Sequence, residues 1–296
     1  MSGPDGEVGE AEVRPRIDAA LVRRLIDAQF PEWRELPIHP VQHDGWDNRT
    51  FRLGDELSVR LPSAAGYVEQ VAKEHTWLPR LAPLLPLPIP QPVAQGSPGQ
   101  GFPFPWSVYR WLPGRPVVLL GDVSRDAALA EAIGRFLVAL RAAPAEGAPG
   151  PGTHNFFRGA PPDVYGEEAL AAFPVLGADA DRARALWAEA TASRWEGPPV
   201  WFQGDVAPGN LLVDDSGALS AVIDFGTSGV GDPACDLVPA WTMFEGAARD
   251  AFRRTVGLDD ATWSRARGWA LWKAAITLRD RPADAEARAT VARLLA

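Results

Sequence analysis

Two stretches in the second half of the chain constrain its fold most, because each sets polar residues at the ends of apolar runs. The first reads VWFQGDVAPGNLLV and covers residues 200–213. One apolar run delivers Asp205 into a loop, a Pro-Gly pair then forces a turn, and Asn210 precedes the next apolar run. A third run, residues 219–223, ends at Asp224. We predict short strands with two carboxylates and one amide at the strand ends, facing one cleft.

This set of polar groups suits phosphoryl transfer. One carboxylate orients an attacking hydroxyl and accepts its proton, while a second carboxylate and an amide oxygen hold magnesium, a hard cation that prefers oxygen ligands. Catalysis of this kind is mostly positioning and charge neutralisation, so few acidic residues are needed. A lone Asp-Gly or Asn-Leu is usually a turn. The combination of Asp205, Asn210 and Asp224 at strand ends favours the catalytic interpretation.

The segments QGDVAPGN (203–210) and IDFGTSGVGDPACDL (223–237) resemble the aminoglycoside phosphotransferase family, whose catalytic loop is usually written His-Gly-Asp-x-x-x-x-Asn. The resemblance implies a protein-kinase-like fold and a phosphate donor that is ATP, with GTP possible. It also implies that Asp205 is the catalytic base, Asn210 a Mg2+ ligand and Asp224 the main Mg2+ ligand.

The sequence departs from the family pattern at two positions. Gln203 stands where the family usually has His, and we expect a hydrogen-bonding Gln to preserve the loop geometry. Arg60 stands where a strand normally supplies a phosphate-binding Lys. Arg is permanently charged and binds phosphate bidentately, with Glu74 as its expected ion-pair partner and Lys73 as the nearest alternative cation. The alternative interpretation of Arg60 is a surface charge at a strand edge.

Two further segments are candidates for nucleotide binding. The turn containing Asp44 and Gly45 falls where the family places its nucleotide-covering loop, although a structural turn explains it equally well. Tyr109 and Trp111 belong to the segment 108–112, the lobe connector whose backbone would receive the purine ring. Their aromatic character is equally typical of a packed strand.

Hydrophobic periodicity predicts an α+β chain with a small β-rich N-terminal lobe and a larger, mainly helical C-terminal lobe. Helices are predicted over 17–30, 67–85, 124–141 and 179–195, and strands over 38–42, 50–53, 57–61, within 102–112 and within 200–225. A Pro-Gly pair at 113–114 marks the lobe boundary. We therefore expect a flexible N-terminus over 1–16, a nucleotide-binding N-lobe over 17–112, and a C-lobe over 113–296 with the catalytic loop, metal site and acceptor pocket.

Composition narrows the possible partners. The net charge of -9 and the pI of about 5.0 argue against nucleic acid, which needs a basic footprint, and favour a cationic small-molecule acceptor. Acidic residues on the later helices are either part of such a pocket or helix caps and solvated faces: Glu245, Asp259 and Asp260. The chain shows neither a signal peptide nor an apolar run of membrane-spanning length, so we expect a cytoplasmic protein without a membrane partner.

Three hypotheses about function remain open. The first is an ATP- and Mg2+-dependent kinase acting on a hydroxyl of an aminoglycoside or related antibiotic. The second is a kinase of a macrolide or another metabolite hydroxyl. The third is a pseudokinase-like protein that binds a nucleotide or ligand without turnover, which Arg60 and Gln203 favour. The presence of Asp205, Asn210 and Asp224 together argues against the third.

Overall fold

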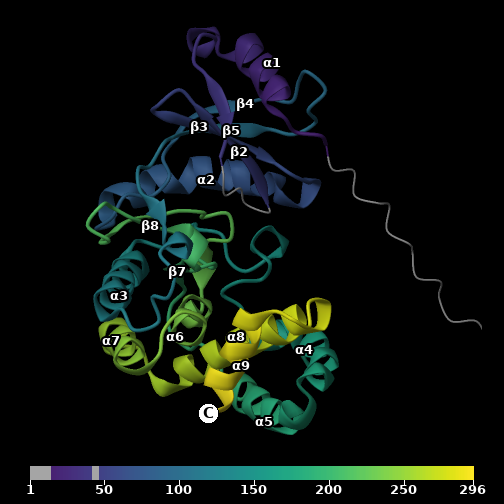
Figure 1. The fold of residues 1–296 in the computed structure, drawn as a ribbon, viewed down its shortest axis with the longest axis vertical. Helices are drawn as coiled ribbons and strands as arrows, with labels where there is room; N and C mark the ends of the chain where they lie inside the picture. The colour runs from purple at the N-terminus through teal and green to yellow at the C-terminus, as the bar shows by residue number, and fades with distance from the viewer. Residues whose placement is uncertain (1–14, 42–46) are drawn as a thin grey trace, which may run out of the picture. The chain divides into compact units, whose positions relative to one another are not determined.

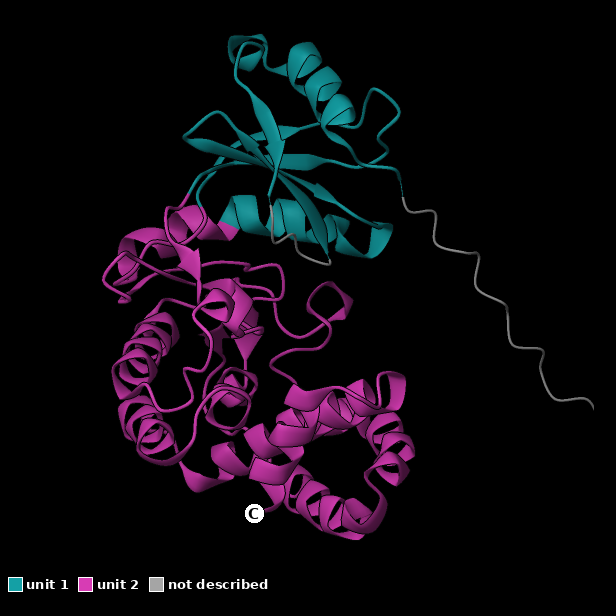
Figure 2. Cartoon of the chain, in the orientation of Figure 1, with its two compact units in different colours: residues 1–76, 91–111 teal, residues 77–90, 112–296 magenta. Residues whose placement is uncertain are grey.

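The computed structural model describes residues 15–41 and 47–296 (Figure 1). The chain divides into two compact units, which Figure 2 shows in different colours. Unit 1 comprises residues 1–76 and 91–111, and unit 2 comprises residues 77–90 and 112–296. Residues 77–90 precede the boundary expected at 112 and nevertheless group with unit 2.

Unit 1 is built on an antiparallel sheet with the strand order β1-β2-β3-β5-β4. Its strands are β1 (Ile38–Pro40), β2 (Asn48–Leu53), β3 (Leu57–Pro62), β4 (Pro92–Gly96) and β5 (Trp106–Arg110). β2 and β3 form a hairpin around Gly54, whose φ of 60° lies in the left-handed region that a residue without Cβ adopts easily. The predicted strands are found, and β4, which begins at Pro92, is an addition.

Helix α1 (Ala19–Gln29) packs its apolar face on this sheet. Asp18 begins the helix, because its carboxylate accepts a hydrogen bond from the backbone N–H of Leu21 at 2.9 Å. Leu21, Leu25 and Ile26 fall on one face and are buried, each contributing roughly 1.5–3 kcal/mol to folding. The second predicted helix is α2 (Val68–Leu81), which continues past the proline near its end.

Unit 2 is mainly helical, with α3 (Ala127–Ala142), α4 (Gly166–Ala172), α5 (Ala180–Thr191), α6 (Pro239–Thr242), α7 (Gly246–Val256), α8 (Asp260–Asp280) and α9 (Ala285–Leu295). α3 packs against α7, and α8 packs against both α5 and α9. The helices α3, α8 and α9 each begin at an aspartate whose side chain caps the first turn. Within the described ranges, no helix combines the length and apolar character that crossing a membrane requires.

Two small antiparallel sheets in unit 2 carry the conspicuous polar segments. One contains β6 (Arg115–Pro116), β8 (Leu211–Val213) and β9 (Leu219–Val222), and the other pairs β7 (Val200–Phe202) with β10 (Gly229–Gly231). The short 3-10 turns η8 (Pro208–Asn210) and η9 (Pro233–Leu237) follow β7 and β10. The strands predicted within 200–225 are thus present, although β7 belongs to a different sheet from β8 and β9.

Candidate active site

Asp205 and Asn210 lie on one loop and contact each other directly. The loop leaves β7 and passes through η8 before β8 begins. The side-chain amide of Asn210 donates to the carboxylate Oδ2 of Asp205 and to its backbone carbonyl, both at 2.9 Å. Because the nitrogen of the amide is used in these contacts, its oxygen is the atom left to face a cation.

Gln203 ties this loop to the segment after β9. Its side-chain oxygen accepts from the backbone N–H of Asp205 at 2.7 Å, and its nitrogen donates to the carbonyls of Ile223 at 3.1 Å and Asp224 at 2.6 Å. The side chain is fully buried, so each of these contacts replaces water. A glutamine therefore holds the loop that leads to Asp205 against the segment that carries Asp224.

Backbone conformation fixes the two segments further. Asp224 has a φ of 60°, an uncommon left-handed conformation for a residue with a side chain. Gly204 has a φ of 88°, and a Cβ at this position would lie 2.7 Å from the carbonyl oxygen of Thr227. The hydroxyl of Thr227 also donates to the carbonyl of Gln203 at 3.1 Å. Only glycine fits between these segments.

A buried carboxylate supports the loop from the other side. Asp236, in η9, accepts hydrogen bonds from the backbone N–H groups of Gln203 at 2.8 Å and Gly204 at 2.7 Å. Burial raises the pKa of Asp236 to about 6, against the opposing effect of these two hydrogen bonds. Asp236 therefore positions the loop that leads to Asp205.

The surroundings of Asp205 make it a stronger base than a free aspartate. Its side chain remains accessible to solvent. Although Asp205 reaches solvent, the surrounding protein partly desolvates its carboxyl, and this is the first cause of its raised pKa. The nearby charge of Asp224 is the second cause. The charges of Arg158 and Lys273 and the hydrogen bond from Asn210 oppose this rise. The two carboxylates that the sequence placed at strand ends are thus close enough to repel each other.

Arg158 and Lys273 were missed at the sequence level. Arg158 donates from Nε to the carbonyl of Gly204 at 3.0 Å, and its guanidinium lies over the rings of Trp269 and Trp272. Lys273 follows on α8. Their distance along the chain from Asp205 explains why no local motif revealed them.

A buried ion pair anchors the segment that leads to Asp236. Arg265 of α8 donates from Nε to Asp232 at 2.6 Å, and its other nitrogens donate to the hydroxyls of Ser193 at 3.0 Å and Thr262 at 2.9 Å. Asp232 in turn caps η9. Sequence analysis gave no sign of this pair; the available signal is a charged residue among the buried apolar residues of α8.

The residues proposed for phosphate binding form a separate cluster within unit 1. Arg60 of β3 pairs with Glu74 of α2, with 3.6 Å between Nη1 and Oε1. Tyr109 of β5 donates its hydroxyl to the other oxygen of Glu74, and the guanidinium of Arg60 lies 5.6 Å from the centre of the Tyr109 ring. Burial first, and then the charge of Glu74, raises the pKa of Tyr109 well above its ordinary value, which keeps it a donor. Lys73 is buried beside this cluster on α2.

Of the remaining candidates for nucleotide binding, the structure describes Trp111 but not the turn that contains Asp44 and Gly45. Trp111 follows β5, where its backbone N–H donates to Glu56 at 2.7 Å and its ring stacks under the guanidinium of Arg52 at 4.1 Å. A purine approaching Trp111 would meet its carbonyl, because the N–H is already used. Asp44 and Gly45 lie outside the described residues.

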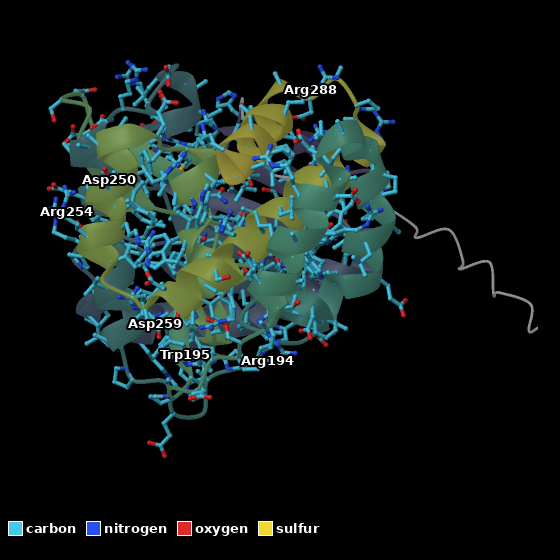
Figure 3. All side chains as sticks on the ribbon, turned by 90° about the horizontal axis from the view of Figure 1, so that it is seen from below. Arg194, Trp195, Asp250, Arg254, Asp259 and Arg288 are labelled. Atoms are coloured by element: carbon cyan, nitrogen blue, oxygen red, sulfur yellow. The ribbon has the colours of Figure 1, made fainter. Side chains whose placement is uncertain are left out.

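The acidic residues considered for a polycation pocket have structural partners. Glu245 lies 3.0 Å from Arg125, and Asp260 lies 2.6 Å from Arg253. Asp259, labelled in Figure 3, caps α8 by accepting from the N–H of Thr262 at 2.7 Å. These contacts fit the alternative interpretation, helix caps and solvated faces.

The donor set fits a magnesium ion that shares its coordination with a nucleotide. Asp224 offers a carboxylate and Asn210 an amide oxygen, both hard oxygen ligands. Over the ranges 15–41 and 47–296, His, Cys, Asp and Glu do not gather in threes to form a metal site made of protein alone. One or two protein ligands supplemented by phosphates are the usual arrangement for magnesium.

Comparisons with known proteins agree with this geometry. The model of the phosphotransferase enzyme family matches residues 38–269, which is most of the chain. No curated protein gives a significant match. The family match and the residues of the catalytic loop confirm the resemblance seen in the sequence.

Solved structures show the same fold. The GDP complex of wild-type aminoglycoside 2'-phosphotransferase-IIIa superposes with a TM-score of 0.71 at 20% identity, over 94% of this chain and 97% of that one. The macrolide 2'-phosphotransferase MphH from Brachybacterium faecium superposes with a TM-score of 0.61 at 23% identity, over 92% of this chain and 97% of that one. The α+β, kinase-like fold is thereby confirmed, and the chain belongs to the phosphotransferase enzyme family.

Proposed function

We propose that this protein transfers the terminal phosphoryl group of ATP, or of GTP, to a hydroxyl of a small molecule in a Mg2+-dependent reaction. The observation that carries the proposal is the hydrogen-bonded pair of Asp205 and Asn210, joined through Gln203 to Asp224. These contacts bring together a base and two oxygen ligands, the minimal set for phosphoryl transfer.

In the proposed reaction, Asp205 accepts the proton of the acceptor hydroxyl. The acceptor oxygen forms a bond to the terminal phosphorus, and the bond from that phosphorus to the bridging oxygen breaks, so that the nucleoside diphosphate leaves with the electron pair. The raised pKa of Asp205 supports its role as base. Asn210 and Asp224 would hold Mg2+, which neutralises charge on the phosphates.

The Arg60 cluster supplies the proposed phosphate contact in unit 1. Glu74 and Tyr109 orient the guanidinium, as the ion pair and the ring contact indicate. Arg binds phosphate oxygens bidentately, so it replaces the charge of the usual Lys with a different geometry. Trp111, Asp44 and Gly45 remain the proposed neighbours of the nucleotide base and phosphates.

The class of acceptor is proposed from the relatives. The solved structures with this fold include an aminoglycoside phosphotransferase with GDP and kanamycin and a macrolide 2'-phosphotransferase. A hydroxylated antibiotic or a related metabolite is therefore the starting class, in a role that would confer antibiotic resistance. The protein would perform this reaction as a cytoplasmic enzyme.

Thermal unfolding with ATP, with and without Mg2+, tests the proposal against pseudokinase-like binding. We expect ATP to raise the melting temperature, and Mg2+ to increase that rise, because metal and nucleotide share oxygen ligands. Consumption of ATP in the presence of a panel of hydroxylated acceptors then separates turnover from binding. A melting temperature that ATP leaves unchanged in both conditions would contradict the proposal.

A further inference from the structure

Two cationic side chains lie on the side of unit 2 that carries Asp205. Arg158 donates to the carbonyl of Gly204, at 3.0 Å, which belongs to the peptide group joined directly to Asp205. The same guanidinium lies 5.3 Å from the ring centre of Trp272. Lys273 is the next residue on α8, and its side chain is exposed. A continuous line of contacts thus runs from the catalytic loop through Arg158 to the turn of α8 that bears Lys273.

The loop that presents Arg158 is held in an uncommon conformation. Phe156 and Phe157 have φ values of 51° and 52°, so two consecutive aromatic residues adopt the left-handed region. The N–H of Phe157 donates to Gly152 at 2.8 Å, and the hydroxyl of Tyr165 donates to the carbonyl of Phe156 at 3.0 Å. Backbone strain of this kind persists where the surroundings impose it, and it concentrates at ligand sites.

This loop also exposes apolar surface to solvent. The side chains of Phe156 and Phe157 are each 37% accessible to solvent. Exposed aromatic residues beside polar groups are typical of a surface that receives a ligand. Arg158, with its aromatic neighbours, therefore combines a charge with an apolar surface.

Two acidic groups, Asp205 and Glu168, act on Lys273. Glu168 is one of two acidic residues of helix α4, and it accepts from Nε1 of Trp272 at 2.8 Å while lying 3.5 Å from Arg279. The charges of Arg158 and Lys273 both act on Asp205, and Arg158 also acts on Lys273. In the proposed reaction Asp205 takes up the proton of the acceptor hydroxyl and Asp224 faces Mg2+, while Glu168 is shared with Arg279, so an anionic group of the acceptor would meet the two cations.

We propose that Arg158 and Lys273 form an anion-recognising subsite for the acceptor, which is then a hydroxyl compound carrying a carboxylate or similar anionic group. The proposal rests on the proposed function, because Asp205 must face the acceptor hydroxyl. Arg158 donates from Nε to the carbonyl of Gly204 and from Nη1 to that of Phe156, and Nη2 keeps N–H donors that suit a carboxylate. Lys273 adds a mobile point charge. Ammonium groups of a polycationic acceptor would meet like charges here, opposite to the preference that the net charge of -9 suggests.

Three aromatic alcohols of similar size test the charge preference: 3-phenyllactate as the anion, 3-phenylpropane-1,2-diol as the neutral compound and phenylalaninol as the cation. Calorimetry measures their binding to the full-length protein, and a coupled assay with Mg2+ and ATP measures phosphate transfer. We expect the anion to bind about tenfold or more tightly than the cation, a difference typical of one favourable charge contact.

Lys273→Glu should reverse this order, because it replaces one of the two cations by an anion. Arg254→Glu, on the exposed face of α7 and labelled in Figure 3, makes the same charge change elsewhere and should leave the order unchanged. The melting temperature of each variant confirms that it folds.

Equal affinity for the three compounds, tighter binding of the cation, or no binding of any of them would overturn the subsite. A Lys273→Glu variant that slows transfer to all three alike, with unchanged affinities, would assign Lys273 to the transferred phosphate and overturn it too. Charge-dependent binding without phosphate transfer to any compound would support the subsite and contradict the proposed function. Phosphate transfer to the cation in preference to the anion would support the proposed function and contradict the subsite.

Discussion

Two ion pairs lie close to the proposed catalytic and phosphate-binding residues, and they are built differently. In unit 2, Nε of Arg265 and Oδ2 of Asp232 are 2.6 Å apart, and both side chains are nearly inaccessible to solvent. The guanidinium of Arg265 also donates to two hydroxyls. In unit 1, Arg60 and Glu74 are 3.6 Å apart, and the Arg60 side chain is 14% accessible. One oxygen of Glu74 is buried without a hydrogen bond.

The difference indicates two kinds of task. A saturated, buried pair has one arrangement and holds the segment leading to Asp236 in place. A longer, partly accessible pair leaves its guanidinium able to turn toward phosphate oxygens. We therefore infer that Arg265 positions the loop, and we keep Arg60 as the proposed phosphate ligand.

Breaking the pair in unit 2 should have the largest effect. Arg265→Met leaves the carboxylate of Asp232 buried without its partner, and we expect a loss of about 3–5 kcal/mol in the free energy of unfolding. Chemical denaturation measures this loss, and Arg254→Met on the exposed face of α7 serves as the control. A loss below about 1 kcal/mol, the usual range of a surface pair, would show that the burial of Arg265 is energetically unimportant.

Asp236→Asn should have the next largest effect. One oxygen of the carboxylate is replaced by an amide nitrogen, which cannot accept from a loop N–H group, at a cost of about 1–3 kcal/mol. The loop that carries Asp205 would shift, and a displacement of about 1 Å is enough to slow transfer roughly 100-fold. Steady-state kinetics with the preferred acceptor measures this change. A rate close to that of the wild type would remove Asp236 from its positioning role.

We also expect Asp236→Asn to change how the free energy of unfolding depends on pH. The pKa of Asp236 is raised from 3.8 to about 6 in the folded protein, so between these values the folded state binds more protons than the unfolded state. Its contribution to stability therefore falls as pH rises from 3.8 to about 6 and is constant above. Unfolding curves across this range should show the slope in the wild type and lose it in Asp236→Asn. An unchanged slope would contradict the raised pKa.

Arg60→Met tests whether the ion pair in unit 1 serves ATP binding. We expect about tenfold weaker binding of ATP, because a charge-assisted hydrogen bond to phosphate is lost, and a smaller loss of stability than in Arg265→Met. Arg60→Lys should restore part of the affinity, since the charge returns without the bidentate geometry. Titration calorimetry with Mg2+ and ATP measures both. Unchanged ATP affinity would return Arg60 to the interpretation of a strand-edge charge.

Gln203→His should have the smallest effect. An imidazole still accepts from Asp205 or donates to the segment after β9, but it cannot make all three hydrogen bonds of the glutamine. The expected cost is about 1 kcal/mol, with transfer rates within tenfold of the wild type. Loss of folding would show that the loop geometry depends on the amide itself.

Features that depend on residues close together in the sequence could be predicted. Asp205 and Asn210 lie five residues apart, and the turn between them brings their side chains into contact. Strand and helix periodicity predicted most elements of the sheet in unit 1 and the helices α3 and α5 of unit 2. Their ends differed by a few residues, because caps and prolines fix the ends more finely than periodicity does. β4 was missed because it begins at a proline.

Long-range contacts were beyond the reach of sequence reasoning. Arg265 and Asp232 are 33 residues apart, and Arg158 lies 46 residues before the carbonyl that it contacts. Only the packing of α8 and the loop after η5 (Thr153–Asn155) brings them to the catalytic loop. The net charge of -9 is an average over the chain, so it does not determine the charges beside Asp205.

Replacement of the proposed base tests the central claim most directly. Asp205→Asn keeps the size of the side chain and its contact with Asn210 but removes the proton acceptor, and Asp215→Asn in the exposed turn after β8 is the control. We predict a loss of phosphate transfer of about 100-fold or more, with Mg2+-dependent ATP binding and melting temperature unchanged. Transfer by Asp205→Asn at a rate close to that of the control would contradict the account.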